Sequence, residues 1–311
     1  MGGKYATETL QANEGGIARA AAILRAGGLV AVPTETVYGL AARADSEEAV
    51  GRIYEAKGRP SFNPLIVHVP TIEQAERLAV FSARSRELAQ DNWPGPLTLV
   101  LPRREDAELA ARVTADLPTL ALRMPDHPVM AALLEAVDFP LAAPSANRSG
   151  FISPTSAKHV LASLDGRIDA VIDGGASRSG LESTIVAVRE DDTVEQLRPG
   201  PIEVARRNSG SGTGSIEAPG QLASHYAPGK PLRLRADDRA DDEFMIGFGE
   251  IAGDCTLSEA GNLEEAASRL YACLHEGARS DKPRIAVASI PDRGIGAAIN
   301  DRLRRAATPP D

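Results

Sequence analysis

Short apolar runs alternate with helix-like segments along the first 205 residues, and this alternation constrains the fold more than any other feature. The runs Leu29–Pro33, Leu65–Val69 and Leu97–Leu101 have the length of buried strands and are too short for buried helices. In the second run we expect every side chain except that of His68 to be buried. Because strands that alternate with helices form α/β sheets, the sequence predicts a twisted sheet of mixed parallel and antiparallel strands, covered by helices.

Further elements are expected around these strands. Ser46 is placed to cap a helix, and Gly27 with Gly28 to end one, because each residue type favours that helix terminus. The other expected strands are Thr119–Arg123 and Asp169–Ile172, and the expected helices are Ile17–Ala26, Ser46–Ala56, Ile72–Leu78, Ala83–Asn92, Val129–Ala136 and Ala157–Leu164.

A stretch rich in glycine and serine divides the chain into two blocks. Residues 206–228 read RRNSGSGTGSIEAPGQLASHYAP, which has few large aliphatic residues and the composition of a linker. We therefore expect a larger α/β domain at 13–205, a linker at 206–229 and a smaller α/β domain at 230–305. The strands expected in the smaller domain are Phe244–Phe248 and Arg284–Ser289, and the helices are Leu263–Glu276 and Ile295–Arg305.

Charge, cysteine content and hydropathy exclude several classes of protein. The net charge is −9 and only 4% of residues are aromatic, which disfavours a protein that tracks a nucleic-acid backbone or stacks on bases. Cys255 and Cys273 are the only cysteines and form no CxxC pair, so we exclude a disulfide framework or zinc ribbon and expect two buried thiols. No apolar run approaches the roughly 18 residues that span a bilayer. The N-terminus lacks the apolar region of a signal peptide, so we expect a soluble, cytoplasmic protein with no membrane partner.

Polar loops follow the predicted strands, where α/β sheets place their sites. The sequence has no Walker loop, no GxGxxG after a strand, no HExxH and no GxSxG. It has instead four loops rich in hydroxyl, amide or cationic side chains, and Arg123 and Arg198 close two further strand-like runs. The loops are 33–40 (PTETVYGL), 57–68 (KGRPSFNPLIVH), 144–154 (PSANRSGFISP) and 173–186 (DGGASRSGLESTIV).

The loop at 57–68 is the strongest single indication of an anion site. It carries Lys57, Arg59 and His68 with no acidic residue in twelve positions, in a chain that is acidic overall. Cations beside a buried strand need a counter-charge, which a ligand can supply. Two loops have an ordinary structural alternative, a hydroxyl-rich turn at 33–40 and a solvated basic loop at 57–68. The alternative for His68 is a core histidine that bonds a backbone carbonyl. Together, the loops predict a wide cleft for a polyanion.

The loops also carry an ordered set of motifs that resembles a known family. In chain order they are PTETVYGL, KGRP, NPL, WPGPLT, RMPDHP, APSAN, GGxxxxGLEST and LRPGP. This set is similar to that of the YrdC-like threonylcarbamoyl-AMP synthase family, over about residues 15–205. The later stretches APGQLASHYAP and PDRGIGAAINDRLRRA resemble the long members, which append a Rossmann-like domain. The resemblance thus implies a YrdC-like sheet domain followed by a small Rossmann-like α/β domain.

The resemblance implies a reaction in which L-threonine, bicarbonate and ATP give threonylcarbamoyl-AMP and pyrophosphate. The nucleophile is a substrate carbamate, so we expect no catalytic side chain and no protein metal ligand, and Mg²⁺ is expected on the ATP phosphates. On the threonine and bicarbonate side, the resemblance implies Thr34, Thr36, Arg59, His68, Arg123 and Ser183. Around ATP it implies Lys57, Asn63, Ser145, Asn147, Ser153, Arg198 and Tyr226.

The same resemblance implies partners and a lid. The adenylate would pass to a tRNA-modifying threonylcarbamoyl-transferase complex, and direct tRNA binding is expected to be weak or absent. A carbamate hydrolyses when water enters, so we expect the linker to close over the cleft through Ser224, His225 and Tyr226, with a Gly/Ser hinge at 209–215.

Two alternatives belong to other functional classes. One is an RNA-binding or ribosome-maturation module, which would show RNA affinity with a steep salt dependence and no ATP consumption. The other is a carbamoyl transferase of hydrogenase maturation, which combines the same domain with acylphosphatase and zinc-finger modules. The lack of CxxC pairs weighs against the second alternative.

Overall fold

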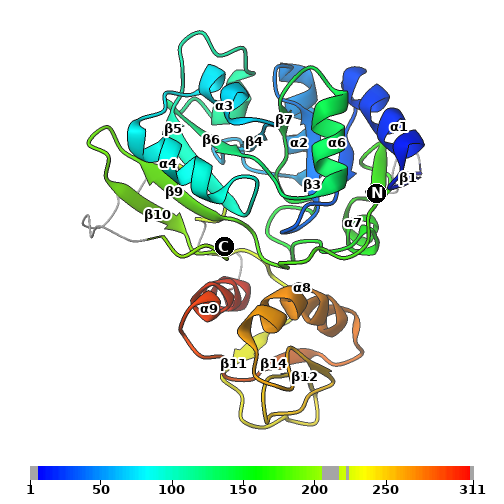
Figure 1. Ribbon diagram of the computed structural model, residues 1–311. Helices are drawn as coiled ribbons and strands as arrows, with labels where there is room; N and C mark the ends of the chain where they lie inside the picture. Colours follow the sequence, from blue (N-terminus) through cyan, green and yellow to red (C-terminus); the bar gives the residue numbers. More distant parts are fainter. Residues whose placement is uncertain (1–5, 205–216, 222–223, 309–311) are drawn as a thin grey trace.

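The computed structural model describes residues 6–204, 217–221 and 224–308. Figure 1 shows two α/β bodies, a larger one from the first two thirds of the chain and a smaller one from the last third. No helix within these ranges is long and apolar enough to cross a membrane. The expected linker includes residues 206–216 and 222–223, which lie outside the described ranges, as does its expected hinge at 209–215.

A ten-stranded sheet forms the larger body, in the order β1-β8-β2-β3-β7-β4-β6-β5-β9-β10. Its strands are β1 (Glu8–Gln11), β2 (Val30–Val32), β3 (Gly39–Arg43), β4 (Ile66–His68), β5 (Leu97–Pro102), β6 (Thr119–Arg123), β7 (Leu141–Ala142), β8 (Ala170–Asp173), β9 (Thr184–Val188) and β10 (Val194–Arg198). Pairs such as β4–β6 and β5–β9 are parallel, whereas β2–β3 and β5–β6 are antiparallel. The expected mixed sheet is therefore confirmed.

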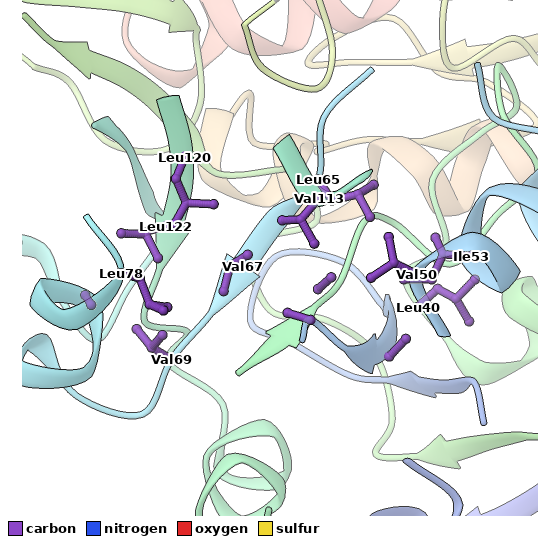
Figure 2. Close-up of a cluster of buried hydrophobic side chains, with 14 of the residues drawn as sticks. Leu40, Val50, Ile53, Leu65, Val67, Val69, Leu78, Val113, Leu120 and Leu122 are labelled. Atoms are coloured by element: carbon purple, nitrogen blue, oxygen red, sulfur yellow. The ribbon is translucent and has the colours of Figure 1, made fainter. Parts of the chain in front are cut away.

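The helices of this body begin at side-chain caps. They are α1 (Glu14–Arg25), α2 (Glu47–Lys57), α3 (Ile72–Leu78), α4 (Ala83–Asn92), α5 (Ala111–Thr114), α6 (Pro128–Ala136) and α7 (Ala157–Leu164), of which α5 alone lacks a cap from a side chain. Ser46 caps α2 as expected, because its hydroxyl accepts a hydrogen bond from the amide of Ala49. The helices bury an aliphatic core against the sheet, and Figure 2 shows Val50 and Ile53 of α2 within the cluster that also holds Val67 and Leu122.

Two expectations about this body need correction. His68 was expected to be the exposed residue of its strand, yet it is only 3% exposed. The strand β4 lies between β7 and β6 inside the sheet, so the face that carries His68 looks into an enclosed region rather than into solvent. The segment 33–40 was expected as a loop, but its last two residues open the strand β3, which pairs with β2.

The smaller body is a parallel sheet with two long helices. Its strands are β11 (Leu232–Leu234), β12 (Glu243–Gly247), β13 (Cys255–Thr256) and β14 (Arg284–Val287), and its helices are α8 (Leu263–Arg279) and α9 (Ile295–Ala307). The strand order is β11-β14-β12-β13, with every pair parallel. This arrangement confirms the expected small α/β body.

The expectation of two free thiols is wrong. Cys255 of β13 and Cys273 of α8 form a disulfide, with their Cα atoms 5.7 Å apart. Both cysteines are buried. The packing of α8 on the sheet brings together two residues that are 18 positions apart in the chain, and the spacing of the cysteines alone does not reveal that contact.

The two bodies meet where a glycine of the larger one lies on α8. Gly180 has a left-handed φ of +66°, and a Cβ atom there would lie 2.5 Å from the Cα and the carbonyl oxygen of Ser268. Both obstructing atoms are backbone and cannot move aside cheaply. The contact between the bodies therefore requires glycine at this position.

Replacing Gly180 should lower the stability of the folded chain. We expect Gly180→Ala to lower the free energy of unfolding by about 2–4 kcal/mol, because it adds steric overlap to the cost of a left-handed alanine. Gly27→Ala is the matched control, since Gly27 has a φ of +78° but no atom lies within 4 Å of the point that a Cβ would occupy. Urea unfolding of both variants checks the prediction, and equal losses would show that the contact with α8 does not matter.

Candidate active site

A cavity lies where the polar loops of the larger body converge, and it encloses about 550 Å³ with its open mouth included. Residues from the ends of β4, β6 and β10 meet residues of the β2–β3 loop and of the segments that follow β7 and β8. Pro219, Gly220, His225 and Tyr226 close one side. The lining residues are Thr34, Thr36, Val37, Gly39, Arg59, Ile66, His68, Arg123, Ala143, Pro144, Ser145, Glu182, Arg198, Pro219, Gly220, His225 and Tyr226.

The β2–β3 loop places two threonine hydroxyls on the cavity. The Thr34 hydroxyl donates to the carbonyl of Val37 at 2.6 Å, and its oxygen lies 2.9 Å from that of Thr36. Because Thr34 donates to the carbonyl, the Thr36 hydroxyl is the donor between the two. The loop is thus folded by its own hydroxyls, and both side chains are buried.

Glu35, between these threonines, forms an ion pair with Arg123 at the end of β6. Its carboxylate oxygen Oε1 accepts from Nη2 of Arg123 at 2.5 Å, and both side chains are at most 5% exposed. Arg123 also donates from Nε to the carbonyl of Gly95 at 3.3 Å. The second carboxylate oxygen, Oε2, has no hydrogen-bond partner in the described part of the chain. Glu35 was missed in the sequence, since nothing near it in the chain points to Arg123.

Lys57 and Arg59 are buried cations that backbone carbonyls hold in place. Nζ of Lys57 donates to the carbonyls of Ser145 and Asn147, each at 2.5 Å. Arg59 donates from Nη2 to the side chain of Asn63 at 2.6 Å and to the carbonyl of Pro64 at 2.8 Å. Burial lowers the pKa of Lys57 well below its usual value and that of Arg59 to about 10. Neither residue forms an ion pair within the described ranges, so the expectation of unbalanced cations is met.

His68 stands beside Arg123 on the neighbouring strand, since the two are register partners of β4 and β6. Burial lowers the pKa of His68 to about 3, so the imidazole is neutral near pH 7. Its Nδ1 is buried and has no partner among the described residues. A neutral imidazole in this position can exchange hydrogen bonds with a ligand without adding charge.

Arg198 closes the far end of the cavity from β10. It donates from Nε to the carbonyl of Ser183 and from Nη2 to the Ser183 hydroxyl, both at 3.0 Å. That hydroxyl lies 2.7 Å from the hydroxyl of Thr98. Burial lowers the pKa of Arg198. Ser183, which directly precedes β9, therefore fixes Arg198 of the antiparallel neighbour β10.

Glu182 is the one acidic residue among the lining residues, and sequence reasoning missed it. Its carboxylate accepts from the hydroxyl of Ser153 at 2.6 Å, from the hydroxyl of Tyr271 at 2.8 Å, and from Nε of Arg302 at 2.9 Å. Burial alone would raise the pKa of Glu182. The charges of Arg302 and Arg198 and the hydrogen bonds outweigh burial and lower this pKa to about 2.

Tyr226 lies on the cavity in an uncommon backbone conformation. Tyr226 has a φ of +65° and is 1% exposed, and its ring centroid lies 4.0 Å from that of His225. The amide of the next residue, Ala227, donates to the carbonyl of Gly150 at 2.8 Å. This hydrogen bond holds the backbone directly after Tyr226 against the loop at 144–154.

Two family models together match nearly the whole chain. One, described as telomere recombination (Sua5, YciO and YrdC), matches residues 22–200, and the other, the C-terminal domain of threonylcarbamoyl-AMP synthase, matches residues 192–308. The chain belongs to the threonylcarbamoyl-AMP synthase family. It is 42% identical to the Bacillus subtilis synthase over 97% of this chain and 95% of that protein, and 40% identical to the Pyrococcus abyssi synthase over 93% of each.

A solved structure extends the family likeness to three dimensions. The crystal structure of P. abyssi Sua5 complexed with L-threonine matches this chain with a TM-score of 0.87 at 37% identity, covering 97% of this chain and 98% of that one. The likeness includes both bodies and confirms the expected fold of a long family member.

The structure places the predicted site residues in two groups around the cavity of this synthase family member. The residues that line it are Thr34, Thr36, Arg59, His68, Arg123, Ser145, Arg198 and Tyr226. A second group stands behind the lining and contacts it. That group is Lys57, Asn63, Asn147, Ser153 and Ser183.

No group of three or more His, Cys, Asp or Glu side chains suited to a metal ion exists among the described residues. Glu182, the acidic lining residue, is fully engaged with its three partners. Mg²⁺ usually binds through substrate phosphates and water with only one or two carboxylates. A magnesium ion brought by a phosphate ligand would therefore meet no carboxylate cage among the described residues.

All five histidines have a lowered pKa, and the chain should lose stability in mild acid as a result. Burial lowers the pKa of His68, His159 and His225 to about 3 and that of His275 to about 4. The unfolded chain protonates these residues near pH 6.5, so it binds more protons than the folded chain below that pH. The free energy of unfolding should therefore fall as the pH falls from 7 to 4, by up to about 1.4 kcal/mol per pH unit for each histidine.

Urea unfolding at pH 7, 6 and 5 measures this slope. His159→Phe retains an aromatic ring against His275, since the two ring centroids are 3.9 Å apart. The variant should reduce the pH dependence of the free energy of unfolding by the contribution of about one bound proton. A free energy of unfolding that stays constant between pH 7 and 5 would contradict the assignment of neutral, buried histidines.

Proposed function

We propose that this chain joins L-threonine, bicarbonate and ATP to give threonylcarbamoyl-AMP and pyrophosphate. The observation that carries the proposal is a cavity lined by Arg59 and Arg198 with Lys57 behind the lining, three buried cations that form no ion pair within the described ranges. Such a cavity favours anions, and the anions of this reaction are a triphosphate, the threonine carboxylate and bicarbonate. Membership of the synthase family supports the same reaction.

The proposed assignment divides the site residues between the two sides of the reaction. For threonine and bicarbonate we propose Thr34, Thr36, Arg59, His68, Arg123 and Ser183. For ATP we propose Lys57, Asn63, Ser145, Asn147, Ser153, Arg198 and Tyr226. Hydrogen bonds between members of the second set support it, because Lys57 shapes the loop that carries Ser145 and Asn147. That loop offers hydroxyl and amide groups of the kind that hold phosphate oxygens.

The proposed chemistry needs positioning more than a catalytic side chain. The threonine amine and bicarbonate form a carbamate and release water, and a carbamate oxygen then attacks the α-phosphorus of ATP. A new P–O bond forms, the bond to the β-phosphate breaks, and pyrophosphate leaves with the electron pair. The arginines and lysine of the cavity would hold the two anions in line and stabilise the charge that develops on the phosphate oxygens. Mg²⁺, carried by ATP, would neutralise part of the triphosphate charge.

The function is tested by pyrophosphate release. We expect the purified chain to release pyrophosphate from ATP with Mg²⁺ only when threonine and bicarbonate are both present. Mass spectrometry of the same reaction should detect threonylcarbamoyl-AMP. Folded protein that leaves ATP untouched under every condition would overturn the proposal and favour the RNA-binding alternative, which salt-dependent RNA titration would then examine.

Arg59→Lys tests the threonine end of the assignment. The variant keeps the positive charge but loses the planar fork that can bind a carboxylate with two hydrogen bonds. We expect the KM for threonine to rise about 10–100-fold, because a hydrogen bond to a charged group is worth about 1.5–3 kcal/mol. The KM for ATP should rise by less, because Arg59 reaches the proposed ATP residue Asn63 only through hydrogen bonds to that residue. Arg178→Lys is the control, since this arginine is exposed and pairs with Asp126 at the surface. A rise in the KM for ATP alone would move Arg59 to the nucleotide end.

We also propose that the segment 206–229, between domains at 13–205 and 230–305, closes the cleft as a lid. The support is the position of His225 and Tyr226 on the cavity wall. A severed linker should admit water to the carbamate, so cutting the chain after Arg206 should leave ATP consumption in excess of adenylate formed. Equal amounts of both would contradict a lid.

The product would serve a later enzyme. Threonylcarbamoyl-AMP is an activated acyl adenylate, and we propose that a threonylcarbamoyl-transferase complex moves its acyl group to the tRNA adenosine next to the anticodon. The net charge of −9 supports weak or absent direct tRNA binding by this chain.

A further inference from the structure

Side chains of the smaller body contact the acidic lining residue of the cavity, Glu182. Two residues on different helices of that body, Tyr271 of α8 and Arg302 of α9, both donate to its carboxylate. Neither side chain has any exposed surface. They are separated from Glu182 by 89 and 120 positions in the chain, so these contacts exist only when the two bodies are packed together.

Glu182 is unfavourable for a triphosphate unless its charge is balanced. It is the acidic residue among the lining residues, and two negative charges in a buried site repel each other strongly. Arg302 is the fixed counter-charge, with Nε 2.9 Å from the carboxylate. Arg302 also donates from Nη1 to Asp301 at 3.0 Å, which holds the guanidinium in place.

The same two residues also contact the wall of the cavity. The guanidinium of Arg302 lies 5.5 Å from the ring centroid of Tyr226, and the ring centroid of Tyr271 lies 5.7 Å from it. Glu182 is followed directly by Ser183, whose carbonyl and hydroxyl both accept from Arg198. A shift of Glu182 would therefore move the groups that hold Arg198 as well as Tyr226.

We propose that Tyr271 and Arg302 are positioning residues for the synthase reaction: through Glu182 they neutralise and fix the ATP end of the cavity. The smaller body then completes the active site of the larger one. The inference rests on the proposed function and extends it, since it assigns to the smaller body a role in binding ATP. Tyr271 and Arg302 touch no substrate and act only through Glu182, Arg198 and Tyr226.

The test compares ATP with threonine in single variants. Tyr271→Phe keeps the ring and loses the hydroxyl, and we expect the KM for ATP to rise about 3–10-fold while that for threonine changes less than about twofold. Arg302→Met removes the counter-charge, and we expect ATP affinity in calorimetry to fall about 10–100-fold, with partial recovery in Arg302→Lys. Arg304→Met is the matched control, because Arg304 is exposed on the same helix and has no ion pair within the described ranges.

A double variant separates positioning from mere stability. In Glu182→Gln the carboxylate charge is gone, so adding Arg302→Met should reduce ATP affinity by clearly less than it does in the parent chain. All variants are measured at a temperature at which each is folded by circular dichroism. The inference would be overturned if Arg302→Met reduced ATP affinity by the same factor with and without Glu182→Gln. It would also be overturned if the variants impaired ATP and threonine equally.

The outcome also separates this inference from the proposed function. Calorimetry with ATP needs no turnover, so ATP binding that depends on Arg302 would support the inference even if no adenylate formed. A parent chain that makes the adenylate with unchanged ATP affinity in every variant would overturn the inference and leave the proposed function intact. A parent chain that neither binds nor consumes ATP would overturn both.

Discussion

Burial of positive charge without acidic partners is the constraint on which the rest of the site depends. Lys57, Arg59 and Arg198 are each at most 9% exposed, and backbone carbonyls and neutral side chains hold them in place of carboxylates. Dehydrating a cation is costly, and the lowered pKa values of all three express that cost. Packing of the sheet and its loops offsets the free energy of dehydrating these cations, and a bound anion would offset part of it as well.

The acidic groups of the site are engaged with specific arginines rather than with these cations. Glu35 pairs with Arg123 on one side, and Glu182 pairs with Arg302 on the other. In buried ion pairs of this kind the attraction offsets dehydration only when geometry and further hydrogen bonds are good. Glu182 has such further hydrogen bonds, from Ser153 and Tyr271, whereas one oxygen of Glu35 has no partner among the described residues. The positive potential is thereby left to the residues between the two pairs, where the cavity lies.

Sequence reasoning succeeded where the information is local and failed where it is not. Helix α3 and strand β6 begin and end at the expected residues, because caps and apolar periodicity act within a few positions. The loops that meet at the cavity were found because polar residues follow strands. Glu35 was missed because its partner is 88 positions away, and the disulfide because helix packing creates it. The burial of His68 was misjudged because alternation cannot tell an enclosed cavity from solvent.

The topology also decides how much of the chain must be synthesised before the sheet and the site can form. Strand β1 pairs with β8, so Glu8 has no strand partner until Ala170 has been made, and the large sheet cannot close at that edge until more than half of the chain exists. The arginine that neutralises Glu182 comes still later, on α9, the last helix of the described chain. Long-range pairings of this kind form late in folding. A nascent chain that lacks α9 would thus present an unbalanced carboxylate to the cavity, and full assembly of the site would have to wait for that helix.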